Sequence, residues 1–231
     1  MNILRTLLVG CSMAVLFSGA GWCAAGAAVK TGNSIDVYRY WPWKPGASWR
    51  FLDMSGLVFR KSYEVKSLGP SKDAEIRVLW PGGWLDYYRE AAAGLERPKD
   101  FDVATGNYGV YDPPAIQYPH FTGLGEVYSR TALRRDYSKD GKLIDGPRKE
   151  EMTYVALGFE DVTVPAGTFK NCLKQERDYK TLGPDGTERR KIAISWNAID
   201  VGPVRGCLLE FSGGKMLNNF CEELTAQGNG R

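Results

Sequence analysis

Hydrophobic and polar residues alternate over much of the chain, which is the pattern of half-buried β-strands. In the segment 188–198 ("ERRKIAISWNA"), for example, Ile192, Ile194 and Trp196 fall on one face. No long amphipathic helix separates such segments, so the pattern favours an all-β fold over α/β architectures. The predicted strands are residues 47–54, 56–69, 74–80, 84–96, 125–137, 149–161, 169–180, 188–198, 204–211 and 215–224.

Glycine-rich turns join consecutive strands and predict an antiparallel meander. They are "PGG" (81–83), "SKDGK" (138–142), "LGPDG" (182–186) and "SGG" (212–214). A sharper corner is expected in "VPAGTFKNC" (164–172), where Pro165 fixes φ and Gly167 can adopt positive φ. Residues 30–225 are predicted to form a single domain, followed by a loose tail at 226–231.

The stretch between residues 84 and 121 does not follow the simple pattern. Residues 84–96 contain alanines and charges that favour a helix, but their aromatic residues and strand neighbours favour a strand. Residues 97–121 contain four prolines with aromatic residues between them. Because proline removes a backbone donor, a long loop or broken strands are expected there.

The amino-terminal segment is typical of a secretory signal peptide. Arg5 precedes an apolar run at residues 7–17, and small residues follow it. Removal of residues 1–27 would leave no transmembrane span in the mature chain. A lipoprotein anchored at Cys11 is the alternative, but the apolar region before that cysteine is short for this purpose. We therefore expect a bacterial periplasmic or secreted protein with a Sec-type signal.

The charge balance argues against polyanionic partners. The full chain carries a formal net charge of +3, and loss of Arg5 with the signal peptide leaves +2 (3 − 1). A nearly neutral domain points to neither nucleic acid nor an anionic membrane surface.

Three cysteines remain in the mature chain, at positions 172, 207 and 221. The segment 207–221 ("CLLEFSGGKMLNNFC") predicts a hairpin turning at Gly213–Gly214, which would bring Cys207 opposite Cys221. In an oxidising compartment this pair is the candidate disulfide. No Cys-x-x-Cys spacing is present and the chain has one histidine, so no metal site or cofactor is predicted.

Two motifs resemble those of a widespread set of bacterial exported and lipoprotein β-domains. "YWPWKPGASW" (40–49) resembles their Trp-Pro-x-Lys-x-Gly-x-x-Trp opening, and "VTVPAGTFKNCLKQE" (162–176) resembles their second signature. "WNAIDVGPVRG" (196–206) is a weaker match to their closing segment. The resemblance implies a curved open antiparallel sheet, related to the half-barrels that carry lipoproteins and other apolar ligands. It implies no particular activity.

Catalytic chemistry finds little support in the residues. Thr168 and Cys172 lie in the "VPAGTFKNC" corner, and a Cys172 nucleophile would need an activating partner such as His120. A glycosidase would need two suitably spaced carboxylates, and nothing selects a pair. The candidates for such a pair are Asp86, Glu90, Asp100, Asp102, Asp112 and Glu126.

Aromatic residues are the stronger signal, because an open concave face could use them to hold a ligand. The candidate ligand-binding residues are Trp41, Trp43, Trp80, Trp84 and Tyr88. We expect a non-catalytic binding domain for an apolar small molecule or an envelope protein partner. A carbohydrate-active hydrolase and a purely structural envelope protein are the alternatives.

Overall fold

A computed structural model describes residues 34–54, 62–68, 70, 76–183 and 185–228. The predicted signal peptide lies outside these residues. One short helix and twelve strands follow one another along the described chain: α1 (Val37–Tyr40), β1 (Ser48–Asp53), β2 (Ser62–Leu68), β3 (Ile76–Trp80), β4 (Trp84–Ala91), β5 (Gly94–Asp102), β6 (Tyr108–Pro119), β7 (Val127–Tyr137), β8 (Leu143–Val164), β9 (Gly167–Leu182), β10 (Glu188–Ala198), β11 (Gly202–Ser212) and β12 (Lys215–Gly228). Within this part of the chain, no helix is long and apolar enough to span a membrane.

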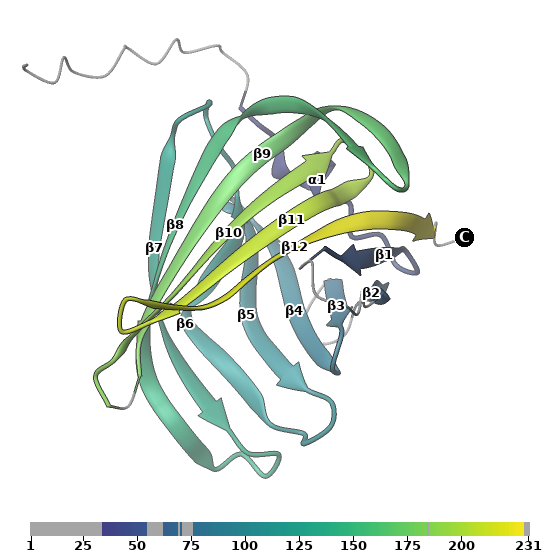
Figure 1. The fold of residues 1–231 in the computed structure, drawn as a ribbon. Helices are drawn as coiled ribbons and strands as arrows, with labels where there is room; N and C mark the ends of the chain where they lie inside the picture. The colour runs from purple at the N-terminus through teal and green to yellow at the C-terminus, as the bar shows by residue number, and fades with distance from the viewer. Residues whose placement is uncertain (1–33, 55–61, 69, 71–75, 184, 229–231) are drawn as a thin grey trace, which may run out of the picture.

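The strands form an antiparallel meander that closes into a barrel. Each strand pairs with the next in sequence, and β1 pairs with both β2 and β12. The long strands β7 to β10 curve around one side, while the short strands β1 to β3 complete the other (Figure 1). The all-β prediction is therefore confirmed.

The expectation of an open half-barrel is wrong. Its two edges would be the first and last strands, and these pair from Ser48 with Gly228 to Asp53 with Glu222. Closure satisfies backbone donors and acceptors that an open edge would expose. The pairing also places residues 226–228 in β12, although the sequence pattern assigns them to a loose tail.

Residues 97–121, for which a long loop or broken strands are expected, belong mainly to β5 and β6, whose pairing is interrupted by register shifts. Residues 84–96 are divided by a turn between β4 and β5. The register of β5 against β6 shifts between Arg97 and Lys99, so Pro98 lies at an irregularity where its missing N–H does little harm. Pro113 and Pro114 lie just beyond Asp112, the last β6 residue paired with β7. Pro98, Pro113 and Pro114 are tolerated because they lie where the pairing shifts or ends, whereas Pro119 near the end of β6 is paired with Gly94.

The segment around α1 covers one end of the barrel interior (Figure 1). The Tyr38 hydroxyl lies 3.2 Å from the Ala91 carbonyl oxygen, and the Asp200 amide donates to the Arg39 carbonyl at 2.7 Å. Ile35 forms an isolated bridge with Phe121. Large aromatic side chains, including fully buried Trp49, pack beneath this segment. The apolar core is thus concentrated at this end, and the other end is left for polar groups.

Candidate functional site

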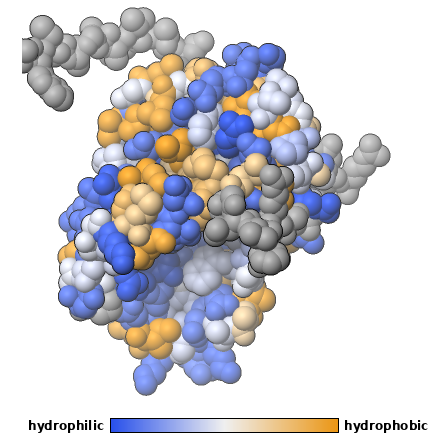
Figure 2. Space-filling view, viewed as in Figure 1, coloured by the Kyte–Doolittle hydropathy of each residue, from blue (hydrophilic) through white to orange (hydrophobic). Residues whose placement is uncertain are grey.

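Below the apolar end, the barrel encloses a polar cavity of about 500 Å³. The space-filling surface is hollowed in the lower half of the view, where hydrophilic residues surround the opening (Figure 2). Seven basic but only two acidic side chains line the cavity. Its charged lining consists of Arg97, Arg134, Arg148, Arg177, Lys180, Arg189, Lys191, Asp100 and Glu150.

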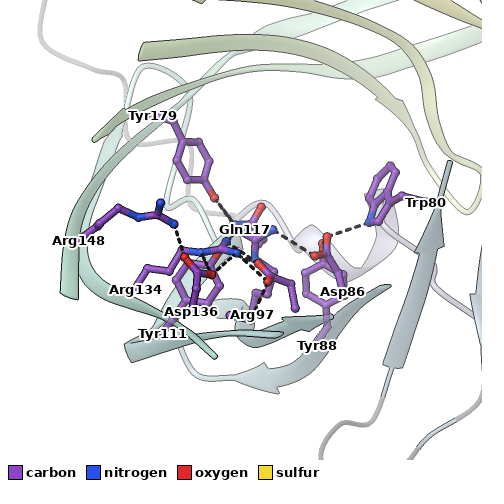
Figure 3. Close-up of polar contacts among 12 residues, drawn as sticks. Trp80, Asp86, Tyr88, Arg97, Tyr111, Gln117, Arg134, Asp136, Arg148 and Tyr179 are labelled. Carbon is purple, nitrogen blue, oxygen red and sulfur yellow. Dashed lines mark hydrogen bonds and ion pairs between the residues drawn. The ribbon is translucent and has the colours of Figure 1, made fainter. Parts of the chain in front are cut away.

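Asp86 is the centre of the first polar cluster. It lies on β4 and is buried, and its Oδ2 accepts hydrogen bonds from Trp80 Nε1 and Tyr88 Oη, both at 2.8 Å. Its Oδ1 accepts from Arg97 Nη1 at 3.2 Å (Figure 3). Burial, reinforced by the Asp86 charge, raises the pKa of Tyr88, so that hydroxyl remains a donor. The carboxylate therefore fixes Arg97 in the cavity wall.

Asp100, which is opposite Asp86 in the β4–β5 register, is the centre of a second cluster. Arg134 holds it with two bonds, from Nη1 to Oδ2 at 2.7 Å and from Nη2 to Oδ1 at 3.0 Å. Tyr111 Oη and the Gly109 amide donate to the same carboxylate at 2.8 and 3.2 Å. These four bonds occupy both oxygens of the Asp100 carboxylate, so little of it is free to act on a substrate.

Arg134 extends the second cluster toward the barrel opening. Its Nη2 lies 2.8 Å from Asp136 Oδ1, and Arg148 pairs with the other oxygen of Asp136 (Figure 3). The neighbouring carboxylates and the Tyr111 hydroxyl offset the effect of burial and raise the pKa of Arg134. Its charge is therefore permanent in the folded protein.

Arg177 on β9 lines the same cavity as Arg97 and Arg134 but has different partners. Its Nη1 donates to Gln117 Oε1 at 2.9 Å, and Gln117 Nε2 donates in turn to Tyr179 Oη. Its guanidinium lies 5.4 Å from the centre of the Tyr179 ring. These partners are electrically neutral, in contrast to the aspartates that hold Arg97 and Arg134.

Glu150 on β8 is a buried carboxyl of the same cavity. Burial raises its pKa, while Arg97 and Arg134 act in the opposite direction. Glu150 is therefore more easily protonated than an exposed glutamate, although cationic side chains surround it.

A second, apolar pocket of about 170 Å³ adjoins the polar cavity. Arg177, Ala193 and Leu208 line both spaces. The apolar part of the lining comes mainly from Trp41, Trp43, Phe51, Trp80, Tyr118, Leu208 and Phe220. The buried indole nitrogens of Trp41 and Trp43 find no hydrogen-bond partner among the described residues. The interior therefore passes from an aromatic pocket to a cationic cavity.

Glu222 on β12 lies in the wall of the apolar pocket. Burial, with a smaller contribution from the Asp53 charge, raises its pKa to about 7. It pairs with Gly206, where a Cβ would come 3.0 Å from the Glu222 Oε1 atom. The glycine thus makes room for a carboxyl inside the barrel.

The five aromatic residues singled out from the sequence all border the interior. Trp41, Trp43 and Trp80 line the apolar pocket. Trp84 lines the polar cavity, and a third recess of about 240 Å³, which shares lining residues with both spaces, is bordered by Trp80, Trp84 and Tyr88. A role of these residues in ligand binding stays a prediction. The sequence pattern did not identify Arg177 and Glu222 as site residues. One signal for Arg177 is that β9 places polar residues two apart on one face, namely Gln175, Arg177, Tyr179 and Thr181.

The other singled-out residues have structural contacts. Cys207 and Cys221 face each other across β11 and β12 and form a disulfide, with their Cα atoms 4.0 Å apart. Pro165 and Ala166 form the turn between β8 and β9, and Gly167 has a φ of +134°. The Ala166 amide donates to the Leu224 carbonyl at 3.0 Å, which ties the corner to β12.

Neither proposed nucleophile of this corner has an activating partner among the described residues. Burial raises the pKa of the Cys172 thiol, which contacts the Phe169 carbonyl oxygen at 3.6 Å. Thr168 lies on the exposed side, with its hydroxyl 3.0 Å from that of Thr163. His120 is at a different place, where its Nδ1 accepts from the Val37 amide at 3.4 Å.

The remaining candidate carboxylates do not converge on one point of the interior. Asp102 accepts from the Ala104 amide at 2.9 Å and from Thr105, and so caps a turn. Glu126 binds the Thr122 hydroxyl at 2.9 Å, and the exposed Asp112 lies 3.7 Å from Arg135. Among the described residues, no three His, Cys, Asp or Glu side chains are grouped as metal ligands.

Comparison with known proteins gives distant structural likenesses. No protein-family model and no curated protein matches the chain. A candidate lipoprotein from Parabacteroides distasonis is 15% identical, with 84% of this chain and 100% of that chain covered and a TM-score of 0.41. A candidate exported protein with a YmcC-like fold from Bacteroides fragilis is 14% identical, with 80% and 97% covered and a TM-score of 0.38. Likenesses at this level transfer no activity, ligand or location to the chain.

Proposed function

We propose that the protein is a non-catalytic binding protein that holds a small molecule with a substantial apolar part inside its barrel. The observation that carries this proposal is the aromatic pocket lined by Trp41, Trp43, Phe51 and Phe220, which continues into a larger cavity. Binding sites for small molecules are concave and mostly apolar, with a few placed polar groups and volumes of roughly 300–1,000 Å³. The apolar pocket supplies the aromatic surface of such a site, and the adjoining cavity supplies the volume and the polar groups.

Hydrolysis of a carbohydrate is the rival function, because Asp86 and Asp100 are cross-strand neighbours. A carboxyl pair that hydrolyses glycosides needs one protonated acid and one free base or nucleophile. Both aspartates instead accept hydrogen bonds from an arginine and a tyrosine, at 2.7 to 3.2 Å. This arrangement supports a role in holding the arginines rather than in bond cleavage.

We further propose an exported, cell-envelope location. The basic, apolar and small-residue order of residues 1–27 supports it. The Cys207–Cys221 disulfide is in keeping with an oxidising compartment such as the periplasm. In the same location, an envelope protein is the alternative binding partner to a small molecule.

The binding proposal can be tested by filling the cavity. Ala193 lines both spaces, so Ala193→Phe should reduce binding of the neutral fluorescent probe N-phenyl-1-naphthylamine at least tenfold. Ile192→Phe is the matched control, because the neighbouring residue of a strand points to the opposite face. Fluorescence titration would measure both. A wild-type protein that binds no probe, or an Ala193→Phe variant that binds it as well as wild type, would refute the proposal.

A further inference from the structure

We infer that the ligand carries an anionic group and that Arg177 binds it. This inference rests on the proposed binding function and adds the ligand class, an anionic amphiphile with a carboxylate or phosphate next to an apolar chain. It starts from the charge environment of Arg177, which differs from that of the other arginines of the cavity.

Three of the five arginines that line the cavity have carboxylate partners. Arg97 pairs with Asp86, Arg134 with Asp100, and Arg148 with Asp145 at 2.6 Å. A fourth, Arg189, is exposed to solvent. Arg177 lines the interior, and among the described residues it forms no ion pair with a carboxylate, although Glu222 lines the same apolar pocket.

The residues directly opposite Arg177 on the two neighbouring strands carry no charge. Its cross-strand neighbours are Tyr154 on β8 and Ala193 on β10. Gln117 and Tyr179 contact it with a carbonyl oxygen and a ring face. Glu150 lines the same cavity, but the arginines whose charges favour its ionised form are Arg97, Arg134 and Arg148. Burying a cation without a counterion is costly, so a site of this kind favours an anion.

The position of Arg177 sets the orientation of such a ligand. Its side chain borders the apolar pocket, the polar cavity and the third recess. A charged group bound there would leave its apolar chain next to Trp43, Leu208 and Phe220. A guanidinium offers a planar fork of donors that matches carboxylate and phosphate oxygens, and only Nη1 donates to Gln117. The geometry thus suits an anionic head and an apolar tail together.

Competition with bound N-phenyl-1-naphthylamine at neutral pH tests the inference. Hexadecanoate and hexadecyl phosphate should displace the neutral probe at concentrations at least tenfold lower than the uncharged 1-hexadecanoylglycerol. Arg177→Gln should abolish this preference without weakening the uncharged competitor, and Arg177→Lys should restore part of it. Arg190→Gln is the control, because Arg190 lies on the neighbouring strand and pairs with Asp178 at 2.8 Å. It should keep the wild-type preference.

The outcomes separate the inference from the function on which it rests. If the uncharged competitor binds as tightly as the anions in the wild type, the anionic class is wrong while the binding function stands. The same conclusion follows if folded Arg177→Gln, checked by thermal unfolding, keeps the wild-type preference. If inorganic phosphate or acetate displaces the probe as well as the long-chain anions do, the amphiphile is wrong. If neither the probe nor any competitor binds, the proposed function itself fails.

Discussion

We expect the stability of the barrel to depend on pH through Glu222. Its side chain is half-buried in the wall of the apolar pocket, and Asp53 on the neighbouring strand β1 adds a like charge. Arg177 and Arg205 line the same pocket, but Arg205 is engaged with Glu223 at 2.8 Å. The folded state therefore disfavours the ionised form of Glu222, and its pKa is raised to about 7 from the ordinary value of 4.5.

The sign and size of the effect follow from proton linkage. Below pH 4.5 the carboxyl is protonated in both states and costs nothing. Between pH 4.5 and about 7 the unfolded chain loses the proton while the folded protein keeps it, so stability declines as the pH rises. Above pH 7 both states are ionised and the full penalty applies. At about 1.4 kcal/mol per pKa unit, this penalty is on the order of 3 kcal/mol.

Glu222→Gln removes the titrating group and keeps its shape. We expect the variant to match the wild type near pH 4.5 and to exceed its free energy of unfolding by on the order of 3 kcal/mol at about pH 8. Urea unfolding across this range measures the difference, which cancels the contributions of other carboxyls. Glu223→Gln is the matched control, because Glu223 is the adjacent carboxylate and pairs with Arg205. The Glu223→Gln variant should not become more stable than the wild type as the pH rises. A Glu222→Gln advantage that is equal at both pH values would refute the reasoning.

Three further changes test the frame of the barrel by urea unfolding. Asp100→Asn should lower the free energy of unfolding by about 3 kcal/mol, because it leaves Arg134 with one fewer buried counterion, and an unchanged midpoint would contradict this. Replacing Cys207 and Cys221 together with serine should cost about 3 kcal/mol for a loop of this length, and equal stability would show that the bridge does not constrain the unfolded chain. Gly94→Ala should destabilise strongly, because its Cβ would lie 2.2 Å from the Tyr118 carbonyl oxygen at a φ of +129°; wild-type stability would rule out this close approach.

Local pattern predicted the regular strands that follow residue 125 but neither the strands at 97–121 nor the closure of the barrel. The predicted boundaries of 188–198 coincide with β10, because alternation and flanking turns are both encoded within that segment. Closure depends on β1 pairing with β12, whose partners Ser48 and Gly228 are far apart in sequence. The pattern of neither segment identifies the other as its partner, so an open sheet and a closed barrel predict the same alternation.

The site was predictable only in its apolar half. The tryptophans near the amino terminus are conspicuous in sequence, and three of the singled-out residues meet in one pocket. The cationic half was hidden, because charged residues in a strand normally mark its solvent face. On β9 the face that carries Arg177 and Tyr179 is the inner one, and only the register against β8 and β10 shows this.

The aromatic pocket and the cationic cavity are accounted for together by one class of ligand. Buried ion pairs such as Arg97–Asp86 seldom stabilise a fold more than apolar residues of the same volume would, so stability alone is a weak reason for them. Their carboxylates instead fix Arg97 and Arg134 against the wall and keep the cavity polar. Arg177, without such a carboxylate, is then the cation whose charge a bound anion can balance. A cavity built only for an apolar ligand would need none of these groups, whereas one built for an anionic amphiphile needs both the aromatic pocket and an uncompensated arginine at its border.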